Sequence, residues 1–235
     1  MAINAGPTTY SQAKRGIVQD GLVLNLDAAV DTSYPGDGTT WYDLEGSNSG
    51  TLTNGPTFDR GEGGSIVFDG SDDYVNFGSQ TWDISTNLTI DFFIKFNTLN
   101  SAAYYTMFSF GGFISNGWLF QINGQNNKLR FAWGATDIFD GPIYTTTNVW
   151  VYLCCVVDSG TPTYIYVNNT SYTPSRTSGS SSFNISGAQN VDIARRTDST
   201  SQYIDGQISN LRVYNRALSA EEVLKNYNAT KWRFQ

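Results

Sequence analysis

The sequence YIDGQISNLRVYNRALSAEEVLKNYNATKWRF, residues 203–234, decides the expected fold of this chain. Its alternation of apolar and polar residues predicts a strand from about Gln207 to Tyr214. A short helix is expected next, because Ser219 is a suitable N-cap residue and Glu222 stands at the N3 position. In such a capping box the Ser219 hydroxyl accepts from the N–H of Glu222, and the Glu222 carboxylate accepts from the N–H of Ser219. This helix stands out because the sequence before it predicts strands almost throughout.

Short apolar stretches with the period of a strand recur from residue 21 onward, separated by turns rich in Gly, Asn and Ser. The clearest is NLTIDFFIKF at 87–96, in which every second residue from Leu88 to Phe96 is apolar and shares one face. A nearly continuous apolar run at 149–157 predicts a central strand. Further strands are expected at 21–27, 51–53, 65–68, 73–77, 105–110, 118–122, 128–133, 164–167, 189–194 and 207–214. Strands without intervening helices indicate an antiparallel sandwich or barrel.

The organisation expected from these patterns is one all-β domain at 21–235, preceded by a polar, aperiodic arm at 1–20. Within it, 65–77 is interpreted as a hairpin-like unit and 173–187 as a loop. Cys154 and Cys155 are neighbours, so a strand would point them to opposite faces, and we expect two buried reduced thiols.

The composition excludes several classes of function. The net charge is −7 and the 14 Lys and Arg residues are scattered, which argues against nucleic-acid binding. No run approaches the roughly 18 apolar residues of a membrane span, and the N-terminal sequence lacks the apolar core of a signal peptide.

Four segments occur in an order that is characteristic of one family. These are SIVFDGSDDYVNF at 65–77, NLTIDFFIKF at 87–96, the Trp-containing strand at 149–158 with its turn segment at 164–168, and DGQISNLRVYNRALSAEE at 205–222. Together they resemble the concanavalin A-like lectin/glucanase superfamily, and within it the laminin-G-like jelly-roll domains. One departure is Asn169, which replaces the usual Gly of the turn. The resemblance implies an antiparallel two-sheet jelly roll with a short C-terminal helix.

The segment GLVLNLDAAVDTSYPGDGTTWYDLEGSNSGTLTNGP at 21–56 resembles a leader found before such domains in bacteriophage virion proteins. This similarity implies a virion structural protein, used for surface decoration or as a fibre-like adhesion module. Such a protein would be made in the host cytoplasm and be oligomeric in the assembled particle. Residues 1–20 would then dock on other virion proteins, for example by adding a strand to a neighbouring sheet.

Catalysis is not expected. Glycoside hydrolases of this superfamily use paired carboxylates on one strand face, and the four glutamates, Glu45, Glu62, Glu221 and Glu222, form no such pattern. The chain contains no histidine, which excludes Ser-His-Asp and Cys-His catalysis and histidine-ligated zinc.

The alternative function is a lectin-like module that binds cell-surface glycans. An aromatic platform is expected from Trp118, Trp133 and Tyr144, with Asn123 and Asn126 as hydrogen-bonding partners. The competing interpretation is that both tryptophans pack in the core.

Calcium dependence is the remaining hypothesis for the lectin-like module. Relatives hold Ca²⁺ at the sandwich rim, and Asp72, Asp73 and Asp205 are the candidate ligands. Ordinary turn chemistry explains these aspartates equally well. Ser209 and Asn210 replace an Asp-Glu pair that family members often carry, which counts against a metal site in the closing strand.

Overall fold

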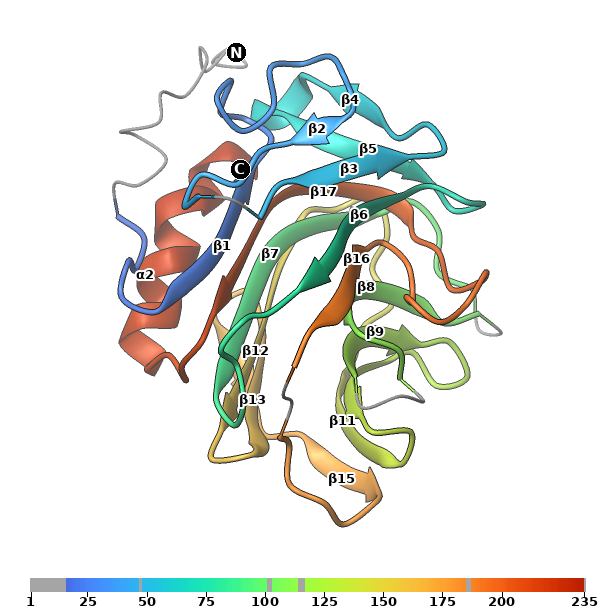
Figure 1. Cartoon of the computed structure of the whole chain (residues 1–235), viewed down its shortest axis with the longest axis vertical. Coiled ribbons are helices and arrows are strands. Elements are labelled where there is room, and N and C mark those ends of the chain that lie inside the picture. The colour runs from blue at the N-terminus through green and yellow to red at the C-terminus, as the bar shows by residue number, and fades with distance from the viewer. Residues whose placement is uncertain (1–15, 47, 101–102, 114–116, 185–186, 235) are drawn as a thin grey trace.

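Two antiparallel sheets form a β-sandwich in the computed structural model of this chain (Figure 1). The structure describes residues 16–46, 48–100, 103–113, 117–184 and 187–234. The first sheet has eight strands, in the order β14 (Thr170–Tyr172), β13 (Thr161–Val167), β12 (Val151–Asp158), β7 (Leu88–Phe96), β17 (Asp205–Tyr214), β5 (Ser65–Asp69) and β4 (Thr57–Asp59), with β1 (Leu22–Asp27) also paired to β17.

The second sheet has nine strands, and its order differs from the order of the chain. It runs β15 (Ser175–Ser178), β11 (Asp137–Ile143), β10 (Lys128–Trp133), β9 (Trp118–Asn123), β8 (Tyr105–Phe110), β16 (Gln189–Ile193), β6 (Tyr74–Gln80), β3 (Gly50–Thr53) and β2 (Thr40–Trp41). The helical elements among the described residues are η1 (Gly61–Gly63), α2 (Ala220–Thr230) and η2 (Lys231–Phe234). The expected jelly-roll sandwich with one short C-terminal α-helix is therefore confirmed.

The eight-stranded sheet is organised around β17. This strand pairs with β7 along most of its length. On its other side it pairs with β5 from Asp205 to Ile208 and with β1 from Asn210 to Tyr214. The change of partner coincides with a register shift between Ile208 and Asn210. One strand thus joins three others that are far apart in the sequence.

The core lies between the sheets, and β7 shows how the sequence pattern fills it. The five alternate residues expected on one face, Leu88, Ile90, Phe92, Ile94 and Phe96, are all fully buried between the sheets. The opposite face of β7 is buried as well, because α2 and η2 cover it. There Phe93 stacks on Tyr227 and Phe234, with ring centroids 6.1 and 4.5 Å apart.

β12 confirms the predicted central strand and the state of the cysteines. Cys155 lies in the core between the sheets, whereas Cys154 lies on the face that packs against α2. Both thiols are free and fully buried. Burial raises the pKa of both above the ordinary value, so neither thiolate forms readily.

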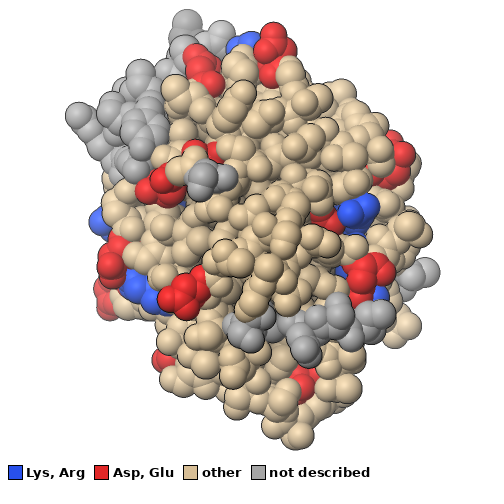
Figure 2. All heavy atoms as spheres, in the orientation of Figure 1, with Lys and Arg blue, Asp and Glu red and all other residues tan. Residues whose placement is uncertain are grey.

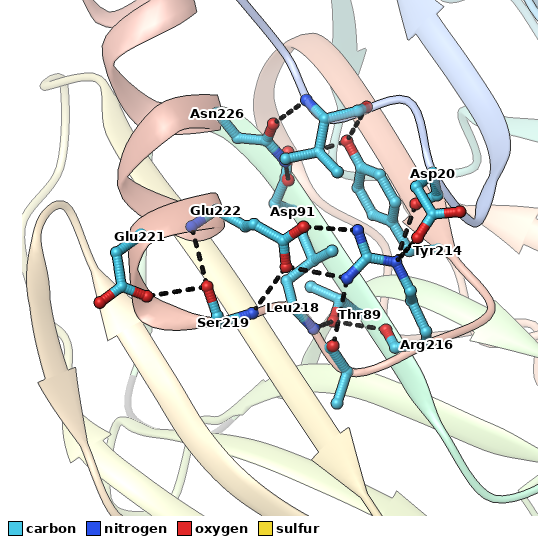
Figure 3. A network of polar contacts seen from close by, with 12 residues as sticks. Asp20, Thr89, Asp91, Tyr214, Arg216, Leu218, Ser219, Glu221, Glu222 and Asn226 are labelled. Atoms are coloured by element: carbon cyan, nitrogen blue, oxygen red, sulfur yellow. Dashed lines mark hydrogen bonds and ion pairs between the residues drawn. The ribbon is translucent and has the colours of Figure 1, made fainter.

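A buried polar network links the sheet to α2, and Figure 3 shows its members Asp91, Tyr214 and Asn226. The Asp91 carboxylate accepts from Arg212 Nε at 2.6 Å and from Asn226 Nδ2 at 2.8 Å. Asn226 Nδ2 also donates to the Tyr214 hydroxyl at 2.9 Å, while its Oδ1 accepts from the N–H of Val18. Burial opposes the charge on Arg212, yet the adjacent carboxylate raises its pKa above the ordinary value. The helix is therefore fixed by a polar network as well as by apolar packing.

The predicted capping box is present at the start of α2. Ser219 Oγ accepts from the Glu222 N–H at 3.3 Å, and Glu222 Oε2 accepts from the Ser219 N–H at 2.9 Å. Glu222 also holds Arg216 through two bonds of 2.8 and 2.6 Å (Figure 3). The Arg216 guanidinium, followed by the Ser219 N–H, lowers the pKa of Glu222 from 4.5 to about 2.

We expect this carboxylate to make stability depend on pH in the acid range. Because the pKa of Glu222 is lower when folded, its stabilisation is complete above about pH 4.5 and is lost as pH falls towards 2. Because Gln keeps the N3 capping bond but loses the ion pair with Arg216, Glu222→Gln should cost up to about 1 kcal/mol of unfolding free energy at pH 7 and much less at pH 2.5. Urea unfolding at both values measures this. In an Arg216→Met background the pH effect should shrink, and equal costs at both pH values would contradict the prediction.

Residues 65–77 do not form the expected hairpin. β5 belongs to the eight-stranded sheet and β6 to the nine-stranded sheet, so the turn between them crosses the sandwich. Asp69 Oδ1 accepts from the N–H of Ser71 at 2.8 Å, and Asp73 Oδ2 accepts from the N–H of Asp69 at 3.1 Å. These side chains supply the acceptors that strand pairing would supply in a hairpin.

Two strands at one end of the nine-stranded sheet, β15 and β11, were also missed. The expected loop 173–187 contains β15, which pairs with β11. Asp137 and Asp140 lie within β11, which the sequence pattern did not predict. Arg176 pairs with Asp137, and Arg130 Nε donates to Asp140 at 2.7 Å. The buried charges of this strand are neutralised by arginines on its two neighbours. Its sequence therefore lacks the apolar alternation from which a strand is predicted.

Residues 16–20 pack on the domain, although the sequence placed them in the arm. Ile17 and Val18 are each 4% exposed. Arg216 Nε donates to the carbonyl of Asp20 at 2.9 Å and pairs with its carboxylate at 3.0 Å. The rest of the expected arm lies outside the described residues.

Candidate functional site

A polar pocket of about 370 Å³ opens at the end of the nine-stranded sheet where β6, β8 and β16 meet. Its lining comes from the end of β6, the turn after β8, the start of β16 and the connection from β16 to β17. The lining residues are Ser79, Gly111, Gly112, Ala188, Gln189, Asn190, Thr197 and Asp198. The size suits a small ligand, and the lining suits a hydroxylated one.

Backbone geometry gives the pocket its floor. Gly111 has φ +73°, and a Cβ there would collide with Gln189 Oε1. Its N–H donates to the carbonyl of Asn190 at 2.6 Å. Ser109 Oγ donates to the carbonyl of Gly111 at 2.9 Å and accepts from the N–H of Thr197 at 3.3 Å. The buried Ser109 hydroxyl therefore ties the floor of the pocket to its wall.

One arginine anchors the wall on the sheet, and a second forms an ion pair within the wall. Arg195 bonds the fully buried Asp192 at 2.8 Å, and its guanidinium carbon lies 3.6 Å from the ring centroid of Tyr74. Arg196 pairs with Asp198 in the pocket wall. Figure 2 shows a largely uncharged face on which basic and acidic atoms lie next to each other at the side that carries β16 and β8 in Figure 1. Charges near the pocket are thus paired.

Several polar groups in the lining are available to a ligand. Within the part of the chain that the structure describes, the side chains of Ser79, Gln189 and Asn190 make no hydrogen bond. The Thr197 hydroxyl also has no partner among the described residues, but its oxygen is buried and so is not exposed to a ligand. Hydroxyls and amides can each donate and accept, which is the hydrogen-bonding pattern that the hydroxyl groups of a sugar require.

The aromatic residues predicted as a platform lie in the core. Trp118 is fully buried and stacks on Phe108 with centroids 5.0 Å apart. Trp133 is 3% exposed and Tyr144 is 6% exposed, and burial raises the pKa of Tyr144 to about 12. None of the three presents a ring face on which a sugar could stack, so the packing interpretation of the two tryptophans holds.

The two asparagines predicted to bind a glycan form hydrogen bonds within the turn between β9 and β10. Asn123 Oδ1 accepts from the N–H of Gln125 at 3.0 Å, and Asn126 Oδ1 accepts from the N–H of Lys128 at 3.1 Å. Both side chains thus satisfy local backbone groups, which is the usual role of Asn in a turn.

The predicted metal ligands are only partly brought together. Asp72 and Asp73 form a group with Asp69 in which one oxygen from each lies within 4.8 Å of the others. Asp205 is not in this group, and its carboxylate accepts from Asn97 Nδ2 at 2.9 Å and from Thr98 Oγ1 at 2.8 Å. Burial raises the pKa of Asp73, whereas the Ser71 N–H lowers that of Asp69. Turn hydrogen bonds account for Asp69 and Asp73.

The fold and a rim pocket define a class of β-sandwich domains in which loops at strand ends carry the binding surface. A family model described as the concanavalin A-like lectin/glucanases superfamily matches residues 69–224. The chain belongs to this superfamily, as the sequence resemblance predicted. No curated protein matches the sequence. No helix among the described residues is long and apolar enough to cross a membrane.

Solved structures confirm the fold at low sequence identity. Trypanosoma rangeli sialidase in complex with sialic acid has a TM-score of 0.68 and 12% identity, and the match covers 92% of this chain and 34% of the sialidase. Domain 4 of AbnA, a GH43 extracellular arabinanase from Geobacillus stearothermophilus in complex with arabinotriose, has a TM-score of 0.66, 16% identity, and coverage of 91% and 100%. The botulinum neurotoxin type G receptor binding domain has a TM-score of 0.62, 16% identity, and coverage of 89% and 51%. This chain thus spans about a third of the sialidase.

Sequence reasoning did not find the pocket. Its residues are Gly, Ser, Ala, Asn, Gln, Thr and Asp, which are common in turns and carry no motif. The only signal was the glycine pair Gly111-Gly112 directly after a strand, where a tight approach of backbone to a ligand is possible.

Proposed function

We propose that this chain is a non-catalytic adhesion module that binds glycans in the rim pocket. The observation that carries the proposal is the set of unpaired hydroxyl and amide groups around a 370 Å³ pocket with a glycine floor. Glycine lets the backbone come close to a ligand, and the side chains offer both donors and acceptors. The match to the arabinanase domain covers all of that domain and 91% of this chain, and that domain is described in complex with arabinotriose.

We propose binding without catalysis because of the number of carboxyl groups among the described lining residues of the pocket. Glycoside hydrolysis in most families needs two carboxyl groups on either side of the bond to be cleaved. Asp198 is the one acidic residue among the described residues that line the pocket, and it is paired with Arg196. A single paired carboxylate supports binding better than hydrolysis.

We further propose that the module acts on a bacteriophage particle. The support is the similarity of residues 21–56 to a leader of virion proteins, together with the jelly roll that this leader precedes. A rigid sandwich with variable loops suits attachment to a cell surface. Mass spectrometry of purified particles tests this part of the proposal, which requires the chain to be present.

Asn190→Ala is expected to weaken glycan binding without changing stability. The side chain is exposed to the pocket and has no protein partner, so its removal costs the ligand hydrogen bonds but leaves the fold intact. We expect a roughly tenfold loss of affinity for the best ligand found on an array that includes arabinotriose. The matched control is Asn228→Ala on the exposed face of α2. Equal affinity of the two variants would contradict the proposed site.

A further inference from the structure

We propose that the pocket selects uncharged glycan ends and discriminates against glycans that end in sialic acid or another carboxylated sugar. The inference rests on the proposed glycan-binding function and adds the substrate class. Its basis is the distribution of charge around the pocket.

The lining offers an anion no free positive charge. Asp198 is the one ionisable side chain among the described lining residues. The described residues on either side of these lining positions, 111–113, 117, 184 and 187–190, include no Lys or Arg. A carboxylated sugar is usually bound by an Arg or Lys that can donate two or more charge-assisted hydrogen bonds. These described residues do not supply one.

The arginines in the adjoining connection are already engaged. Arg196 pairs with Asp198, and its guanidinium carbon lies 5.7 Å from the ring centroid of Phe113. Arg195 is bonded to Asp192 through both Nε and Nη2 and lies over the ring of Tyr74. Asp192 is fully buried, so withdrawing Arg195 would leave a buried carboxylate uncompensated. Neither cation is free to meet a ligand carboxylate.

The net charge of the chain acts in the same direction. At −7 the protein repels anions at long range, and the Asp198 carboxylate would face a ligand carboxylate at short range. Neutral sugars experience neither penalty, and they match the hydroxyl and amide groups of the lining.

The test compares each glycan with its sialylated form. Arrays and titrations would use neutral N-acetyllactosamine and 3′-sialyl-N-acetyllactosamine, together with arabinotriose, on the wild-type protein, Asp198→Asn and the control Asp31→Asn. Asp31 is exposed in the turn after β1 and makes no hydrogen bond or ion pair in the described part of the chain. We expect the wild type to bind a neutral glycan at least about tenfold more tightly than its carboxylated counterpart.

In Asp198→Asn this preference should shrink or reverse, because Arg196 loses its carboxylate partner and becomes available to an anion. Asp31→Asn should behave as the wild type. Equal or tighter binding of the sialylated glycan by the wild type would overturn the selectivity while leaving the proposed function in place. Absence of binding to every glycan on the array would overturn both.

Discussion

Asp91→Ala is expected to lower the unfolding free energy by about 3–5 kcal/mol, because it leaves the buried Arg212 guanidinium without its counter-charge. The Arg212 and Asp91 side chains are 4% and 0% exposed, so water cannot replace the lost carboxylate. Asn226 would also lose an acceptor, which weakens the attachment of α2. Urea unfolding followed by circular dichroism measures the change.

The double variant Asp91→Leu with Arg212→Met is the informative control. Replacing both members of a buried ion pair with apolar residues of similar size is often nearly neutral. We therefore expect the double variant to recover most of the stability lost in Asp91→Ala. A double variant as unstable as the single one would mean that the pair stabilises the fold by itself, and a single variant that costs under about 1 kcal/mol would show that the charge is not truly buried.

Trp118→Ala is expected to cost about 3–5 kcal/mol, as large-to-small changes in a packed core do. The indole is fully buried, with its ring stacked on Phe108 and Phe131 at centroid distances of 5.0 and 5.4 Å. Phe183 meets its edge at 6.5 Å. Removing the ring would open a cavity that these aromatic neighbours cannot close without losing their own contacts.

The contrast with an exposed tryptophan tests the core assignment directly. Trp232 is 51% exposed, and Trp232→Ala should change the unfolding free energy by less than about 1 kcal/mol. If Trp118 instead served as a platform for sugars, Trp118→Ala would abolish glycan binding and leave the urea midpoint unchanged. That result would refute its place in the core.

Local and periodic features were predictable from the sequence. The alternation of 87–96 has the period of a strand, and burial of one face follows from it directly. The capping box at Ser219 and Glu222 involves residues within one turn, so no tertiary information is needed to place it. The opposite orientation of Cys154 and Cys155 follows from the same geometry.

Long-range choices were not predictable in this way. Nothing within 65–77 states which sheet each strand joins, because the pairing partners, such as Asp205 for β5 and Asp192 for β6, come from distant segments. β11 carries charged residues whose arginine partners lie on other strands. Tertiary contacts therefore determine which sheet each strand joins, because the periodic pattern of the sequence does not specify it. The pocket is the extreme case, since its lining residues are ordinary turn residues until three strands bring them together.

The position of β17 has a consequence for how the protein is made. Residues 205–214 are the last strand to be synthesised among those described, yet they lie in the middle of the eight-stranded sheet and join β1, β5 and β7. During synthesis on a ribosome, the backbone N–H and C=O groups with which the earlier strands pair to β17 stay unpaired until residue 214 has emerged. Contacts between such distant segments slow folding and expose apolar edges meanwhile. Nascent chains that stop before residue 205 should therefore be prone to aggregation, whereas those that pass α2 close the sheet in one late step.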